Sequence, residues 1–279
     1  MNHFLVFQSD FGLVDGAVSA MKGVAYKVDP GLILGDITHD ITPYNVFEAS
    51  YRLFQTVNYW PAGTVFVSVV DPGVGSSRKS VVAKTRGGQY IVTPNNGTLT
   101  HLNAFVGIET LREIEERTNR LENSLLSYTF HGRDVYAYTG ARLASQTISY
   151  EEVGAQMALS EVVSLGLYGA QQDETSVTGQ IDILDVRFGS LWTSIPFDMF
   201  RALGFEFGDY VEVRICNNNM PVYMNRIVYG RSFADVRVGE PIIYMNSVNH
   251  MALAINQGSF AKAYNIGVGI PWTLSFTKV

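Results

Sequence analysis

Three aspartates in the first half of the chain each follow a short apolar run. The runs span residues 3–7, 31–35 and 64–70, and the aspartates are Asp10, Asp36 and Asp71. In open α/β sheets ligands bind beyond the carboxyl ends of the strands, so carboxylates there would face one crevice if the strands are neighbours. Each aspartate could instead cap a following helix, and Asp36 fits that alternative best. The spacing predicts a candidate site at this edge of a sheet.

Helical patterns alternate with these strand-like runs, which is typical of a sheet covered by helices. A 3.6-residue period predicts a helix over 15–28, and Pro43 is expected to open a second helix that continues to about residue 58. Two β-rich runs around Arg86-Gly-Gly88 predict a hairpin over 80–93. A further helix is expected from His131 to about Ser145.

The second half of the chain differs in pattern from the first. Residues 166–178 lose periodicity and gain Gly, Gln and Asp, which favours a linker, and short β runs separated by turn signals follow it. The sequence therefore predicts an α/β protein. Residues 1–165 would form a Rossmann-like domain with a mostly parallel sheet, and residues 179–279 a smaller β-barrel.

Composition excludes several classes of partner. The formal net charge of −6 and the absence of a basic cluster argue against nucleic acid. No apolar run approaches the roughly 20 residues that span a bilayer, and no secretory signal is apparent, so a cytoplasmic protein without a membrane partner is expected. The single cysteine, Cys216, and the scattered histidines predict neither a disulfide framework nor a metal site.

Five motifs in the first half occur together in one order. They are Ser9-Asp-Phe-Gly12, Asp36-Ile-Thr-His39, Asp71-Pro-Gly-Val-Gly75 followed by Arg78, Pro94-Asn-Asn-Gly-Thr-Leu99, and Phe130-His-Gly-Arg-Asp134. A single such motif is weak evidence, whereas five at this order and spacing are specific. On these residues the chain resembles the S-adenosylmethionine hydroxide adenosyltransferase family.

The resemblance implies hydrolysis of S-adenosylmethionine to adenosine and methionine, without a cofactor. The family's catalytic triad matches Asp71, Arg78 and His131. Related enzymes that transfer fluoride or chloride to the same carbon lack that set. A positioned base typically contributes about 10²–10⁴-fold to such a reaction, and either Asp71 or His131 could be the proton acceptor.

Other matched positions bind the substrate in the family. They are Asp10, Asp15, Tyr44, Phe130, Asp185, Ser190, Trp192, Tyr244, Ser247 and Gly258. Asp10 would accept from the ribose hydroxyls, and Asp15 and Asp185 would face the methionine ammonium group. Two positions depart from the family pattern: Ser190 replaces an Asn that reads adenine, and Val248 replaces an Arg that contacts the methionine carboxylate in the halogenating relatives.

These departures leave alternatives open. The chain could be a halide adenosyltransferase, or a non-catalytic adenosine-binding protein, and its substrate could be a related adenosyl compound with a different tail. The resemblance also implies a homotrimer with sites between subunits.

Overall fold

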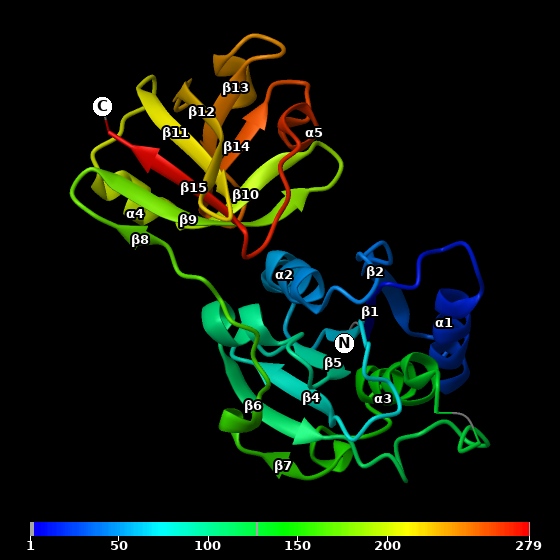
Figure 1. Ribbon diagram of the computed structural model, residues 1–279. Helices are drawn as coiled ribbons and strands as arrows, with labels where there is room; N and C mark the ends of the chain where they lie inside the picture. Colours follow the sequence, from blue (N-terminus) through cyan, green and yellow to red (C-terminus); the bar gives the residue numbers. More distant parts are fainter. Residues whose placement is uncertain (1–2, 127, 279) are drawn as a thin grey trace. The chain divides into compact units, whose positions relative to one another are not determined.

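The chain divides into two compact units, Met1–Leu165 and Gly166–Val279 (Figure 1). The computed structural model describes residues 3–126 and 128–278. Within those ranges, no helix is both long enough and apolar enough to cross a bilayer.

The first unit is built around a seven-stranded sheet. Its strands are β1 (Phe4–Ser9), β2 (Ile33–Thr38), β3 (Val65–Val69), β4 (Ser80–Thr85), β5 (Tyr90–Pro94), β6 (Ile108–Glu113) and β7 (Gln156–Met157). Its helical segments are α1 (Ala17–Val28), α2 (Val46–Thr56), η1 (Val57–Tyr59), η2 (Leu102–Val106), η3 (Gly132–Ala137), α3 (Tyr138–Ala144), η4 (Glu151–Val153) and η5 (Leu159–Glu161). The predicted strands, helices and hairpin of this half are confirmed, with shifted ends.

The sheet is mixed, in the order β2-β1-β3-β5-β4-β6-β7. The pairs along β2-β1-β3-β5 are parallel, and the pairs along β5-β4-β6-β7 are antiparallel. The expectation of a mostly parallel sheet therefore holds for only one half of it. The hairpin between β4 and β5 accounts for the first antiparallel pair, because a tight turn can join only antiparallel neighbours.

Helices cover both faces of the sheet. Successive side chains along β1 point to opposite faces, and Leu5, Val6 and Phe7 are all apolar, so both faces have to be covered. Leu5 and Phe7 pack with Met21 of α1 and with α3 on one face. Val6 packs with Leu53 of α2 on the opposite face. All of these side chains are excluded from solvent. This three-layer core fixes the strand ends that carry the candidate site.

One predicted helix start is wrong, and one alternative interpretation of an aspartate is excluded. Pro43 does not open the second helix, because Asn45 caps α2 by accepting a hydrogen bond from the Glu48 amide at 3.0 Å. Asp36 caps no helix either. It lies inside β2 and accepts a hydrogen bond from Lys22 Nζ at 2.6 Å. Burial raises the pKa of Asp36, but the hydrogen bonds and charges of Lys22 and His39 together outweigh burial and hold that pKa below its ordinary value.

The second unit is a curled antiparallel sheet. Its strands are β8 (Gln171–Gln172), β9 (Ser176–Asp185), β10 (Ser190–Pro196), β11 (Tyr210–Asn217), β12 (Met220–Val228), β13 (Pro241–Met245), β14 (His250–Ile255) and β15 (Trp272–Thr277), with α4 (Phe197–Ala202), η6 (Phe233–Asp235) and α5 (Phe260–Tyr264). The order is β12-β11-β15-β9-β10-β14-β13. In the described residues, the two ends of this order share no ladder and are joined only by one isolated bridge, between Tyr229 and Ile243. The predicted barrel is thus a half-barrel in the described residues.

Candidate active site

The carboxyl ends of β1 and β3 carry the first candidate residues. These strands pair in parallel with Ser9 opposite Val69, so Asp10 and Asp71 follow neighbouring strand ends. The chain turns from β1 to β2 on one side and reaches β3 on the other, which makes this the switch point where open α/β sheets bind ligands. A cavity of about 410 Å³ opens there, and its lining includes Asp10, Tyr44, Asp71, Phe130 and His131.

Arg78 holds the carboxylate of Asp71 through two hydrogen bonds. Its Nε donates to Asp71 Oδ1 at 2.9 Å, and its Nη2 donates to Asp71 Oδ2. Only 11% of the Arg78 side chain and 5% of the Asp71 side chain are exposed. Burial lowers the pKa of Arg78, but the hydrogen bond to Asp71 and the charges of the surrounding acidic groups together outweigh burial and raise that pKa. A two-point contact of this kind fixes the orientation of the carboxylate.

His131 is the third member of the cluster. It immediately precedes η3, and its Nδ1 lies 3.0 Å from Arg78 Nη2. Its Nε2 lies 3.1 Å from Nη2 of a second arginine, Arg120. Burial lowers the pKa of His131; Glu116 opposes this effect, and both arginines add to it. The structure therefore favours a neutral imidazole, and it brings all three predicted catalytic residues together.

The predicted ribose-binding carboxylate is oriented by the backbone. Asp10 Oδ2 accepts from the amide of Tyr44 at 2.9 Å, so it does not cap the next helix. Tyr44 is in the left-handed region at φ 68°, and its side chain is 73% exposed at the cavity. Phe130 meets Phe11 edge to face, with ring centroids 5.8 Å apart. Asp15 is not among the residues that line the cavity, and it accepts from the Ala17 amide at the start of α1.

The six remaining substrate-binding predictions fall on one cavity in the second unit. This cavity holds about 750 Å³ and is lined by Asp185, Ser190, Trp192, Tyr244, Ser247 and Gly258, among others. Trp192 Nε1 donates to the Tyr244 hydroxyl at 3.2 Å, and burial raises the pKa of Tyr244. Phe188 and Phe233 also line it, although the sequence analysis did not single them out. Aromatic side chains that line a cavity can stack on a flat heterocycle.

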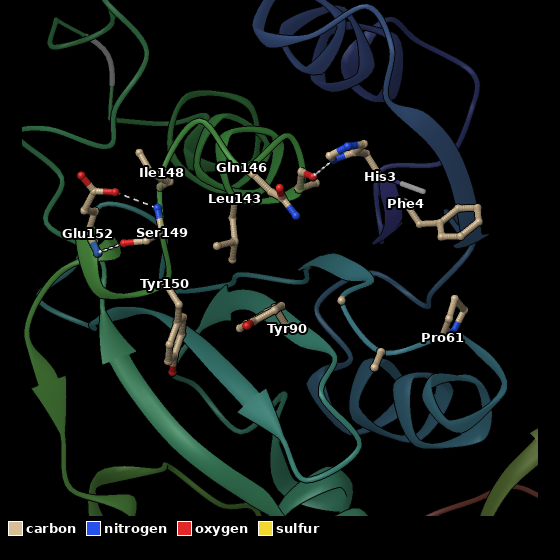
Figure 2. A pocket seen from close by; sticks show the side chains of 13 residues that line it. His3, Phe4, Pro61, Tyr90, Leu143, Gln146, Ile148, Ser149, Tyr150 and Glu152 are labelled. Carbon is tan, nitrogen blue, oxygen red and sulfur yellow. Dashed lines mark hydrogen bonds between the residues drawn. The ribbon is translucent and has the colours of Figure 1, made fainter. Parts of the chain in front are cut away.

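A third cavity lies at the opposite edge of the first unit's sheet. Figure 2 shows it between His3 and Phe4 at the start of β1, Tyr90 at the start of β5, and Tyr150. It holds about 700 Å³, and none of the predicted site residues lines it. Because ligands in open α/β sheets bind at the carboxyl ends of the strands, this cavity is not the candidate active site.

Comparison with known proteins agrees with the geometry. Residues 5–154 match the SAM hydroxide adenosyltransferase N-terminal domain, and residues 179–273 match the C-terminal domain of the same family. The chain belongs to this family. The resemblance that the five motifs suggested is thereby confirmed.

Named members of the SAM hydroxide adenosyltransferase family are similar over most of their length. A protein from Methanocaldococcus jannaschii, named (R)-S-adenosyl-L-methionine hydrolase, is 35% identical over 77% of this chain and 74% of its own. One of the same name from Thermus thermophilus is 32% identical over 95% and 96%. A fluorinase from Actinopolyspora mzabensis is 28% identical over 95% of each chain. The crystal structure of an uncharacterized conserved protein from Thermotoga maritima superposes with a TM-score of 0.90 at 33% identity, covering 98% of this chain and 100% of that one.

Within the family, the structure adds polar groups that sequence reasoning missed. Arg120 and Glu116 lie next to His131, and Ser80 and Tyr136 lie next to Arg78. The four-residue spacing of Glu116 and Arg120 was visible in the sequence, but exposed ion pairs show the same spacing. In the described residues, no cluster of three or more His, Cys, Asp or Glu could hold a metal ion.

Proposed function

We propose that this protein hydrolyses S-adenosylmethionine to adenosine and L-methionine. The observation that carries the proposal is the contact cluster of Asp71, Arg78 and His131 at the switch-point cavity. The hydrolase relatives, at 32–35% identity, support it.

The reaction balances without a metal or a cofactor. Water attacks C5′ and forms a C–O bond, while the C5′–S bond breaks and its electron pair goes to sulfur, which leaves as the neutral thioether of methionine. The water releases one proton. Because the sulfonium is already a good leaving group, the protein has to supply only position and a proton acceptor.

Asp71 is the better proton acceptor of the two candidates. A neutral imidazole has a single acceptor lone pair, and both ring nitrogens of His131 face guanidinium donors. The carboxylate of Asp71 keeps lone pairs beyond those that Arg78 occupies. Arg78 makes Asp71 a weaker base, but the oxygen that adds to C5′ becomes strongly acidic, so a carboxylate suffices.

We propose that Asp10 holds the ribose hydroxyls and that Tyr44 and Phe130 flank the sugar. By resemblance to the family, Asp15 and Asp185 would face the ammonium group, and five residues that line the second-unit cavity would hold the adenine and the tail: Ser190, Trp192, Tyr244, Ser247 and Gly258. We also propose a homotrimer and a Rossmann-like first unit. Light scattering at working concentration tests the trimer.

Incubation with S-adenosylmethionine in ¹⁸O-labelled water tests the reaction. Label in the 5′-hydroxyl of adenosine is the expected result. Asp71→Asn should lower the turnover number by about 10²–10⁴-fold and leave adenosine binding largely intact. Unchanged turnover in that variant would remove Asp71 from the mechanism, and intact substrate after long incubation of the wild type would leave only an adenosine-binding protein.

The fluorinase relatives motivate a second candidate, halide transfer. Adding chloride or fluoride to the same assay decides, because a halide transferase would yield 5′-halogenated adenosine. The contact of Asp71 with Arg78 and of Arg78 with His131 favours water as the nucleophile.

Val248 stands where the halogenating relatives use an Arg, so recognition of the methionine tail is a separate question. Comparing turnover of S-adenosylmethionine with that of a tail-truncated adenosyl sulfonium measures how much the tail contributes.

A further inference from the structure

Arg120 contacts the catalytic cluster through His131. Its side chain is 4% exposed, and its Nη2 lies 3.1 Å from His131 Nε2. The same nitrogen donates to Glu116 Oε2 at 2.5 Å. Arg120 does not line the cavity, so it is placed to act on the imidazole and not on a substrate.

These contacts close a ring of polar groups around the site. Arg78 Nη1 donates to Ser80 Oγ at 3.0 Å, and Ser80 Oγ donates to Glu116 Oε1 at 3.2 Å. The ring continues from Glu116 through Arg120 to His131 and back to Arg78. If the imidazole is neutral, the two positive charges of Arg78 and Arg120 equal the two negative charges of Asp71 and Glu116.

The ring geometry discriminates between the charge states of His131. A neutral imidazole can accept one of the two guanidinium hydrogen bonds. An imidazolium carries N–H donors on both nitrogens, so both contacts would set donor against donor and cation against cation. Arg78 is needed to hold Asp71, whereas Arg120 has no contact with that carboxylate.

We propose that Arg120 is a positioning residue: it holds the ring of His131 uncharged and in place, and Glu116 is its counter-ion. The consequence for function rests on the proposed hydrolase activity. The substrate is a sulfonium cation, and an imidazolium beside it would weaken its binding. An uncharged ring can instead approach the cation and the attacking water without repulsion.

The two partners of the ion pair should act on His131 in opposite directions. The charged groups that act on the ring are Asp71 and Arg78 from the segment after β3, and Glu116 and Arg120 from the segment after β6. Removing the charge with Arg120→Gln should raise the pKa of His131 by about 1 or more, and Glu116→Gln should lower it. The double variant should return it close to the wild-type value.

NMR titration of the histidine ring carbons in the full chain measures this directly, with His131→Gln to assign the signal among the five histidines. Arg117→Gln is the matched control, because its side chain is 89% exposed and pairs with Glu115. It should leave the titration of His131 unchanged. A purely structural role would move the two ion-pair variants in the same direction. That result, or a shift below about 0.3 in Arg120→Gln, would overturn the proposal.

Turnover gives a second readout. In Arg120→Gln the acid limb of the profile of kcat against pH should move to higher pH, and Arg120→Lys should restore most of it. If Arg120→Gln does not fold, Glu116→Gln decides alone, because Glu116 is 35% exposed and its replacement is better tolerated. An unchanged pKa of His131 in Glu116→Gln would then refute the proposal. A wild type that leaves S-adenosylmethionine intact would refute the hydrolase proposal, while the titration would still decide the role of Arg120.

Discussion

Replacing Arg78 tests how far the buried clamp supports both the fold and the chemistry. Arg78→Met leaves the carboxylate of Asp71, which is 5% exposed, without its ionic partner. Removing one member of a buried pair costs about 3–5 kcal/mol, because the remaining charge is desolvated and uncompensated. Since a domain is stable by only about 5–15 kcal/mol, the variant should lose a large share of that margin.

Two further variants separate charge from geometry. Arg78→Lys keeps a positive charge but loses the two-point fork and the contact to Ser80, so an intermediate loss of about 1.5–3 kcal/mol is expected. Lys79→Met is the matched control. Its side chain is 42% exposed and pairs with Glu113 and Glu161, and solvent-exposed ion pairs of this kind contribute little to stability.

Urea unfolding followed by far-ultraviolet circular dichroism gives the free energies, and kcat is measured on the same samples. We expect the loss of stability to rank Arg78→Met, then Arg78→Lys, then Lys79→Met, and kcat to fall only in the two Arg78 variants. If Arg78→Met unfolds no more easily than Lys79→Met, the account of a desolvated, clamped carboxylate is refuted.

Three further outcomes are expected. Phe188→Ala should weaken adenosine binding by about tenfold in calorimetric titration without loss of stability, because this ring lines the second-unit cavity yet is 66% exposed; unchanged affinity would exclude it from the binding site. Gly154→Ala should destabilise the first unit by more than about 2 kcal/mol in urea, because φ is 152° and a Cβ would lie 2.1 Å from the Glu113 carbonyl oxygen; a near-neutral effect would contradict that packing. Burial raises the pKa of Asp182 to about 7, so its contribution to stability is present below pH 4 and is lost as pH rises through 7. Asp182→Asn should therefore be the more stable chain at pH 8 and not at pH 4, and equal unfolding curves at pH 8 would show that the carboxyl is not desolvated.

Local patterns predicted most elements of the fold. A short apolar run at residues 3–7 and a 3.6-residue period over 15–28 identified β1 and α1, because a central strand is buried on both faces and a covering helix on one. Propensity misled at Pro43, where a side-chain cap at Asn45 sets the start of α2. The antiparallel half of the sheet could not be predicted, because the periodicity of a strand carries no information about its direction or its pairing partner.

Sequence alone identified the family and, through its motifs, the candidate catalytic residues. Asp71, Arg78 and His131 were recognisable because they stand in motifs that resemble those of the family. Tertiary structure alone decided their environment. It placed Asp36 in a pair with Lys22, and it buried Arg120 against His131 although the two are eleven residues apart. The physical reason is that the strength and sign of a polar interaction depend on burial and on distance, and both are set by packing between segments that are separate in the sequence.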